Sequence, residues 1–558
     1  MKKLALLGTS SLRSFAFAGA ALAMAGPAYA QDSTGAETTT TQEEDPAATS
    51  GDIATVPEQV EPSEGDTITV TGSRIRRNEF NSPDPVAIID TELAERQGQL
   101  DTGDVLQSSP VAAGSSQITS AISSNFVTNG GQGASTISLR GLGAERTLVL
   151  LNGRRAGPAG TRGAVASFDL NALPLSIIER FEILKTGASS VYGSDAVAGV
   201  VNIITKRDTD GLELDGFSSV PLQGGGENYR ASATFGKVFD RGHFMATVDY
   251  FKRNELKRGD RSYLNCPEEY LFRENSRERA DLIDPRTGNY RCNDTLWGHI
   301  WLYDYISNSP NGSNLFGANG RPIPRLQFNY EGTLQNFIPP LQPPTDINQF
   351  GAPPGFFPVG YDGPSRAVEN AFHPFISDST VSPKIERYTA YAQGSFELSE
   401  NIELFAELLH NRRKTAQNSY RQFWNFGYVE NFPFYDNRGN FLGTAGDPFA
   451  PGFSGEVLIS PTTITDHFDT AQRVDYTRGV FGARGDLGFL SGWSWDAYGQ
   501  YSRSKGIYET DVIFDDAVDS QDFRFESCVG TVTAVRKVPC IDINFTDPRF
   551  LRGDFNAV

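Results

Sequence analysis

The sequence has few of the residues that build metal and redox sites, with 5 histidines and 4 cysteines among 558 residues. Beyond Ala30 it has no apolar run of about 18 residues, which excludes a transmembrane helix there. The motifs HExxH, GxSxG and GxxxxGK[ST] are also absent. The histidines are scattered, at His243, His299, His373, His410 and His467. We therefore predict no catalytic site, no metal site and no cofactor.

Positive charge is scarce as well. The chain has 49 Lys and Arg against 68 Asp and Glu, a formal net charge of −19, which argues against nucleic acid as a partner. Residues 31–65 carry nine acidic residues and no Lys or Arg. Such a segment buries too little apolar surface to offset its ordering entropy. It is predicted to be a disordered acidic linker.

Residues 1–30 have the layout of a secretory signal peptide. Lys2, Lys3 and Arg13 precede or flank an apolar stretch, and Ala28-Tyr29-Ala30 forms an A-x-A cleavage site. An exported protein meets an oxidising compartment, where cysteines close in sequence form disulfides. Cys266 with Cys292 and Cys528 with Cys540 are the two predicted pairs, and a zinc site is the alternative.

The segment DTITVTGSRI, residues 66–75, ends the acidic linker with five β-branched residues in succession: Thr67, Ile68, Thr69, Val70 and Thr71. This composition favours extended backbone. A short strand at the end of a tether is suited to joining the sheet edge of another protein. It is equally compatible with being the first strand of the following domain, and both interpretations stay open.

Residues 76–206 are predicted to form a compact α+β domain. Strands are expected at Val86–Asp90, Ser135–Arg140, Thr147–Leu151, Phe181–Lys185 and Val200–Lys206, and helices at Thr91–Gln97 and Asp101–Gln107. Asn152-Gly153 is a strong signal for a type I′ turn. Gly187, Gly193 and Gly199 fall six residues apart, where tight turns exclude a Cβ. High glycine and modest apolar content suggest a domain that packs inside something else.

From Leu212 onward apolar and polar residues alternate, as in a sheet with water on one side only. Seven strands are predicted: 212–220, 228–238, 243–253, 384–398, 402–413, 473–487 and 493–510. Three of the connections are short turns, whereas 254–383, 414–472 and 511–558 are very long. Short turns on one side and long loops on the other are typical of an outer-membrane barrel. Both cysteine pairs fall in the long connections.

Three stretches resemble the TonB-dependent receptors of Gram-negative outer membranes. DTITVTGSRI is similar to the TonB box and its flank. ISLRGLGAERTLVLLNGRR (137–155) and FDLNALPLSIIERFEILKTGASSVYGSDAVAGVVNIITK (168–206) are similar to the plug domain. The resemblance covers residues 66–206 by motif and 207–558 by pattern.

The resemblance implies an α+β plug inside a large antiparallel transmembrane β-barrel of about 22 strands. It implies a monomer in the outer-membrane lipid, driven by TonB at residues 67–71, that imports a scarce bulky nutrient of the iron–siderophore, carbohydrate or cobalamin class. It also implies a latch in which plug arginines pair with barrel carboxylates. By motif these arginines are Arg140 and Arg180.

Two features depart from the family pattern. Residues 207–558 are too few for the whole barrel, and the sequence ends without a terminal aromatic strand, so a chain lacking the C-terminal part of the barrel is expected. Because only about 35 residues separate the cleavage site from the TonB box, no signalling domain is expected before residue 66. The alternatives are a non-transporting binding or adhesion protein and an inactive truncated receptor. The aromatic residues Trp297, Trp301, Tyr303, Tyr305, Phe356 and Phe357 of the first long loop are interpreted as packing anchors or as surfaces that stack on a ligand.

Overall fold

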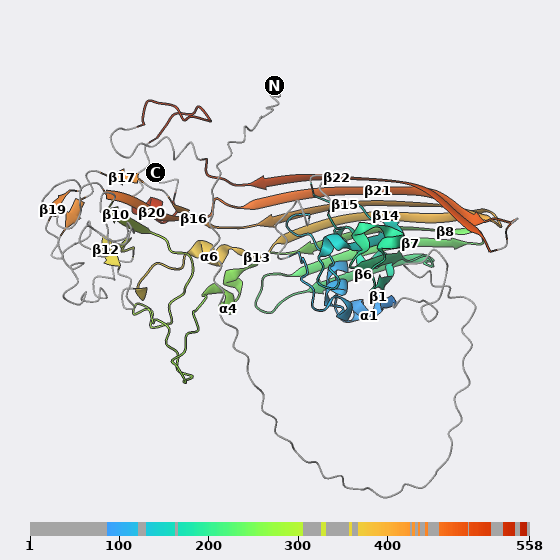
Figure 1. Cartoon of the computed structure of the whole chain (residues 1–558), viewed down its shortest axis with the longest axis horizontal. Coiled ribbons are helices and arrows are strands. Elements are labelled where there is room, and N and C mark those ends of the chain that lie inside the picture. Colours follow the sequence, from blue (N-terminus) through green and yellow to red (C-terminus); the bar gives the residue numbers. More distant parts are fainter. Residues whose placement is uncertain are drawn as a thin grey trace, which may run out of the picture. The chain divides into compact units, whose positions relative to one another are not determined.

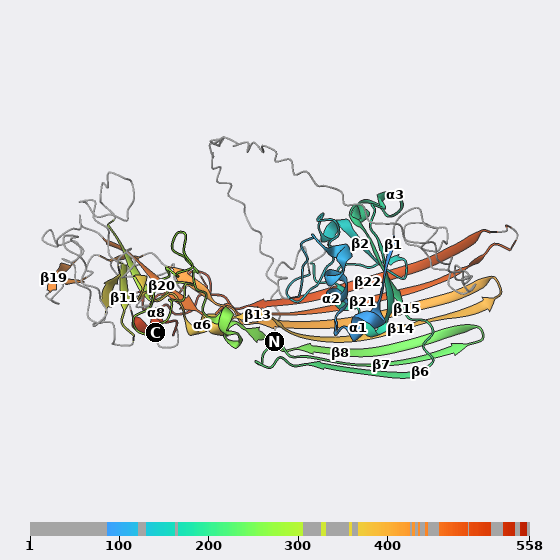
Figure 2. The same ribbon diagram turned by 90° about the horizontal axis from the view of Figure 1, so that it is seen from below.

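The computed structural model describes residues 86–120, 130–161, 166–304, 325–330, 356–359, 366–424, 427–429, 433–435, 441–444, 457–488, 490, 492–514, 528–541 and 547–554. Two bodies of regular structure stand out in these ranges: a small α+β domain and a long antiparallel sheet (Figures 1 and 2). No helix in the described ranges is long and apolar enough to span a membrane. The signal peptide, the acidic linker and residues 66–75 lie outside the described residues.

The small domain is built on a five-stranded sheet with the order β1-β4-β5-β2-β3. Its strands are β1 (Val86–Asp90), β2 (Thr147–Leu151), β3 (Arg154–Arg155), β4 (Ile178–Leu184) and β5 (Gly199–Thr205). Its helices are α1 (Thr91–Arg96), α2 (Thr102–Ser108) and α3 (Ser189–Tyr192). Strands β2 and β5 run parallel, and the other pairs run antiparallel.

Local chemistry explains these elements. Asp101 caps α2 by accepting a hydrogen bond from the amide of Gly103, as its sequence position predicted. Asn152 and Gly153 have φ of 52° and 79° and turn the chain from β2 into β3. Gly199 has φ of 147°, and a Cβ there would lie 2.6 Å from the carbonyl oxygen of Leu184. A side chain at Gly199 would therefore separate β5 from β4.

The strand predicted at Ser135–Arg140 is wrong. Among the described residues, its single ladder contact is an isolated bridge between Ile118 and Thr136. Side chains take its backbone amides instead: Ser138 N donates to Gln117 Oε1 and Leu139 N donates to the hydroxyl of Thr147. Residues 135–139 are buried, but no strand in the described part of the chain pairs with them.

The long sheet confirms all seven predicted strands, and its order is β22-β21-β15-β14-β8-β7-β6. They are β6 (Gly211–Ser219), β7 (Asn228–Phe239), β8 (Gly242–Arg253), β14 (Lys384–Ser399), β15 (Ile402–Gln417), β21 (Thr470–Asp486) and β22 (Ser494–Thr510). Within the described residues the sheet is open, with β6 and β22 at its edges. We call the end of the sheet at which β7 turns into β8, β14 into β15 and β21 into β22 the short-turn end. The opposite end, from which the long connections leave, is the long-loop end.

One face of this sheet, the inner face, contacts the small domain (Figure 2). Side chains of Met245, Tyr391, Leu409, Val474 and Tyr476 project from it into the core of the small domain. The opposite, outer face carries exposed apolar residues, among them Phe244, Val248, Leu408 and Phe481. The small domain thus completes its core with side chains of the sheet, which agrees with its low apolar content.

The long connections fold together at the long-loop end. β10 (His299–Asp304), β11 (Arg325–Phe328) and β12 (Phe356–Val359) come from the first long loop, and β16 (Arg421–Trp424), β17 (Gly427–Val429) and β20 (Val457–Thr465) come from the second. β10 and β20 pair antiparallel and so join the two loops. Shorter elements are β9 (Leu256–Lys257), α4 (Ser262–Asn265), α6 (Pro374–Asp378), β13 (Thr380–Ser382), β18 (Pro433–Tyr435), β19 (Phe441–Thr444) and α8 (Pro548–Leu551).

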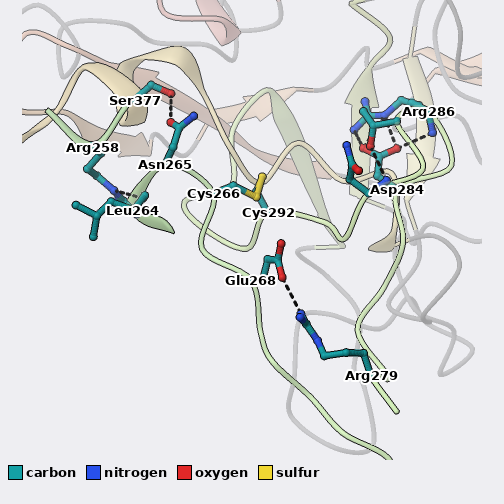
Figure 3. Close-up of a disulfide and its surroundings, with 12 residues drawn as sticks. Arg258, Leu264, Asn265, Cys266, Glu268, Arg279, Asp284, Arg286, Cys292 and Ser377 are labelled. Atoms are coloured by element: carbon teal, nitrogen blue, oxygen red, sulfur yellow. Dashed lines mark hydrogen bonds and ion pairs between the residues drawn. A yellow bond between two sulfur atoms is a disulfide. The ribbon is translucent and has the colours of Figure 1, made fainter. Parts of the chain in front are cut away.

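Both predicted disulfides are present, Cys266–Cys292 and Cys528–Cys540. Figure 3 shows the first of them beside an ion pair between Glu268 and Arg279, which measures 2.8 Å. Trp297 packs in a buried cluster with Ile376 and Ile464, and its indole donates to the carbonyl of Phe372 at 2.8 Å. Trp297 is therefore a packing anchor of the loops.

Candidate functional site: a charged interface between the small domain and the sheet

Three arginines form a row across the inner face, near the long-loop end. Arg230 on β7 is aligned with Phe251 on β8, Phe251 with Arg387 on β14, and Arg387 with Arg413 on β15. All three arginines are buried. We call Arg230, Arg387 and Arg413 the arginine row. A buried cation is stable only when its charge is paired and its donors are bonded.

Each member of the arginine row meets a carboxylate of the small domain. The pairs are Arg230 with Glu95 at 3.4 Å, Arg387 with Asp101 at 2.9 Å and Arg413 with Asp169 at 3.2 Å. Arg413 also donates to the carbonyl oxygens of Gly130 and Gln132, and Arg387 donates to Asn171 Oδ1 at 2.6 Å. The sheet therefore holds the small domain through both charge and backbone.

Helix capping places two of these carboxylates. Asp101 Oδ1 accepts from the amide of Gly103 at the start of α2, and Asp169 Oδ1 accepts from the amides of Ser135 and Asn171. The other oxygen, Oδ2, of each aspartate faces its arginine. Because one oxygen is fixed by the local fold, the second is held in place for the ion pair without further ordering of the side chain.

The polarity is reversed nearer the short-turn end. There the sheet supplies the carboxylate of Glu407 on β15, and the small domain supplies Arg154, 3.1 Å away. Arg478 of β21 lies 2.8 Å from the same carboxylate, and Asn152 Nδ2 donates to it at 3.1 Å. The turn at Asn152-Gly153 delivers both polar groups of the small domain to one glutamate. We call Glu407, Arg154, Arg478 and Asn152 the glutamate cluster.

Aromatic rings enclose the Arg154 guanidinium, which lies 4.2 Å from the ring centroid of Phe405 and 4.9 Å from that of Tyr498. Cation–π contacts of this kind strengthen when water is excluded. Arg154 also reaches Asp496 on β22 at 3.5 Å. The cation is therefore held on three sides by the sheet.

The ion pairs and hydrogen bonds determine the energetic cost of disrupting this interface. Removing one partner of a buried pair costs about 3–5 kcal/mol, because the other charge is left uncompensated. When the two surfaces separate into water, however, both charges are solvated at once. Separating the domain from the sheet would therefore expose these charges together with the apolar side chains that the sheet contributes to the core of the domain.

One carboxylate beside the arginine row titrates unusually. Burial, followed by the neighbouring charge of Asp101, raises the pKa of Asp104 to about 6 from 3.8. The arginines Arg253 and Arg387 oppose this rise. The carboxyl group of Asp104 therefore ionises at a higher pH than that of an ordinary aspartate.

Comparison with known proteins identifies the small domain. Residues 78–200 match the family model described as the TonB-dependent Receptor Plug Domain. The small domain is a TonB-dependent receptor plug. This confirms the resemblance seen in the plug motifs, and the arginine row and the glutamate cluster are contacts between the plug and the sheet.

Solved structures of three receptors match the chain at low identity. The siderophore receptor PirA from Pseudomonas aeruginosa is 14% identical, with 77% of this chain and 49% of that chain covered and a TM-score of 0.29. The ferric enterobactin receptor PfeA from P. aeruginosa, in complex with BCV-L6, is 16% identical, with coverage of 78% and 56% and a TM-score of 0.28. BauA, the ferric preacinetobactin receptor from Acinetobacter baumannii, is 10% identical, with coverage of 79% and 50% and a TM-score of 0.35. The chain spans about half the length of each receptor, and the assignment rests on the plug.

The residues assigned to the latch by motif have other surroundings. Arg180 pairs with Glu182 at 3.0 Å and with Glu179, and both carboxylates belong to the plug. Arg140 is exposed in a loop and has φ of 56°. In the described ranges neither arginine is paired with a carboxylate of the sheet, so their role as latch residues stays a prediction. Residues 67–71, assigned to TonB binding, lie outside the described residues.

The sequence contained a signal for the contacts that were missed. Arg387 and Arg413 occupy inner-face positions of alternating strands, where a cation needs a partner from the plug. Asp101 was already recognised as a helix cap.

In the described part of the chain, no three His, Cys, Asp or Glu side chains come together in a way that could hold a metal ion.

Proposed function

We propose that this chain serves in a TonB-dependent outer-membrane receptor that imports a scarce, bulky nutrient with energy from the inner membrane. The observation that supports the proposal is the plug on the inner face of the sheet, held by the arginine row and the glutamate cluster. An enzyme needs no such releasable domain. A receptor whose pore is blocked by its own domain does.

The proposed mechanism begins with the nutrient binding to the long loops and the adjacent plug surface. Residues 67–71 then add as a strand to the C-terminal domain of TonB. The outer membrane holds no ATP and no ion gradient of its own, so the force must come from this contact. Force on the tether breaks the ion pairs between plug and sheet one after another and opens a path.

The nutrient is proposed to belong to the iron–siderophore, carbohydrate or cobalamin class. Compounds of these classes are too large to diffuse through porins, so their import requires energy. The side chain of Trp297 packs in the buried cluster of the loops. The indole of Trp301 donates a hydrogen bond to the Thr462 hydroxyl at 3.1 Å.

Proline substitution in the TonB box tests the proposal. Ile68→Pro or Val70→Pro removes a backbone donor that strand addition requires, and we expect binding of the purified full chain to the TonB C-terminal domain to fall at least tenfold. Ile68→Ala keeps the donor and should bind within about threefold of the wild type. Thr55→Pro, in the acidic linker, controls for proline itself.

Uptake by cells gives the second readout, with labelled ferric enterobactin, maltodextrin and cobalamin as probes. We expect one probe to be taken up by the wild type, and the proline variants to bind that probe at the surface without importing it. If the proline variants bind the TonB domain as well as the wild type, the box assignment is wrong. If a probe binds but the wild-type chain never binds the TonB domain, the non-transporting alternative holds.

A further inference from the structure

The outer face of the sheet carries a group of cations close to the long-loop end. Pairing register places Lys414 of β15 opposite Arg473 of β21, and Arg412 opposite Asp475, which in turn lies opposite Lys505 of β22. Two further cations, Lys252 of β8 and Arg503 of β22, occupy outer-face positions at a similar level along the strands. We call the six residues the outer cation belt: Lys252, Arg412, Lys414, Arg473, Arg503 and Lys505.

Carboxylates on this face are too few to neutralise the belt. Asp475 accepts both Arg412 at 2.5 Å and Arg473 at 2.9 Å, so two cations share one anion. Glu386 lies opposite both Lys252 and Lys414 in the pairing register, but its ion pair is with Lys384, at 3.5 Å. In the described residues, no carboxylate forms an ion pair with Lys414, Arg503 or Lys505. The belt is thus a positive surface on a chain whose formal net charge is −19.

This arrangement costs folding energy. Like charges directly opposite each other on adjacent strands are destabilising. Lys414 faces Arg473 in that way on β21, and the attraction of Glu386 opposite it on β14 offsets only part of this repulsion. On the inner face the same strands present buried arginines that each meet a carboxylate. An anion supplied from outside the chain would remove the repulsion on the outer face.

The belt borders the apolar part of the outer face. Tyr250 and Tyr388 pack together with ring centroids 5.0 Å apart, and Lys414 Nζ lies 6.0 Å from the Tyr388 ring. Toward the short-turn end follow Val248, Leu408 and other exposed apolar residues. Successive outer-face positions are about 7 Å apart along a strand. Tyrosines and cations directly above an apolar band mark the level of lipid headgroups in membrane sheets.

We propose that the outer cation belt is a binding site for phosphate-bearing membrane lipid, with the phosphates at Lys414, Arg503 and Lys505 and the acyl chains along the apolar band. The proposal rests on the placement of the sheet in a membrane given under the proposed function. Bound lipid would neutralise the Lys414–Arg473 repulsion and fix the height of the sheet in the bilayer. A neutral lipid offers the same chains but lacks a net anionic headgroup.

The test uses the purified full chain in neutral detergent micelles that contain trace lipid A, phosphatidylglycerol or phosphatidylcholine. Retention of each labelled lipid by the immobilised chain gives its affinity. We expect lipid A and phosphatidylglycerol to be retained far better than phosphatidylcholine. Each cation near an anionic surface is worth roughly fivefold in affinity, so Lys414→Gln/Arg503→Gln/Lys505→Gln should lower lipid A binding by about 100-fold.

Arg273→Gln/Arg277→Gln/Lys537→Gln is the matched control, because it removes three exposed cations from loops and causes the same change in net charge. It should bind lipid A like the wild type. Equal retention of phosphatidylcholine, equal loss in both variants, or full displacement of lipid A by millimolar inorganic phosphate would each overturn the proposal. No TonB and no nutrient is present, so a negative result here leaves the proposed function intact.

Discussion

The two faces of the long sheet use the same strands and the same basic residues in opposite ways. Arg413 points to the plug and is 1% exposed in its side chain, paired with Asp169. Its chain neighbour Arg412 points outward, with its side chain 39% exposed, and shares Asp475 with Arg473. Strand alternation turns two consecutive arginines into a buried structural contact and a solvent-facing charge.

The two faces differ both in how tightly each charge is held and in the balance between cations and carboxylates. On the inner face the plug supplies one carboxylate for each member of the arginine row. On the outer face cations outnumber carboxylates, and solvent or lipid must provide the rest. Exposed pairs are worth about 0–1 kcal/mol, whereas breaking a buried pair costs about 3–5 kcal/mol. The inner face therefore holds the plug in place, whereas the charges of the outer face interact with the medium around the sheet.

The largest effect is expected from Arg413→Met. It leaves Asp169 buried without its cation and removes the donors to Gly130 and Gln132. We expect a loss of about 3–5 kcal/mol, visible in urea unfolding in micelles and as faster proteolysis of the plug. Arg412→Met, one residue away on the outer face, should change stability by less than about 1 kcal/mol. Equal losses in the two variants would show that the inner pair does not hold the plug.

The sequence predicted the seven strands, both disulfides and the plug motifs, because each depends on local pattern. Alternation along β15, for example, is visible in the order of Ala406, Glu407 and Leu408 without any partner. The turn at Asn152 was predicted for the same reason, since it needs only two adjacent residues.

Contacts between distant segments could not be predicted in this way. Which carboxylate meets Arg387 depends on where the plug rests along the strand, and residues 101 and 387 are 286 positions apart. The false strand at Ser135–Arg140 failed because acceptor side chains such as Gln117 and Thr147 replaced a neighbouring strand. Pairing of β10 with β20 joins two long loops whose sequences carry no sign of each other.

A smaller effect is expected from pH. In the folded chain burial, followed by the charge of Asp101, raises the pKa of Asp104 to about 6, against 3.8 when unfolded. The folded state then holds its proton more tightly, so the free energy of unfolding should fall as pH rises from 4 to 6 and stay lower above. Asp104→Asn should remove this fall and stabilise the plug at pH 7.5, by about 1 kcal/mol given the partial exposure of the side chain.

Asp195 provides the opposite control for the pH series. A hydrogen bond from Arg155 holds the pKa of Asp195 below its usual range. Its contribution should be present at neutral pH and disappear as the pH falls through that lowered pKa. Asp195→Asn should therefore destabilise slightly at pH 7.5. If Asp104→Asn shows the same sign as Asp195→Asn at that pH, the assignment of Asp104 is wrong.

The smallest effect is expected from a substitution on the outer face of the sheet. Lys414 lies opposite Arg473 on β21 and opposite Glu386 on β14, and Glu386 forms its ion pair with Lys384 instead. Lys414→Gln should therefore stabilise the chain in neutral micelles by no more than about 0.5 kcal/mol. The gain should shrink in high salt, because screening weakens the repulsion between exposed charges. It should reverse in micelles containing lipid A, where the lysine gains a phosphate partner. Urea unfolding in the three media distinguishes these cases, and a loss of stability in neutral micelles would mean that the outer cations already have partners within the chain.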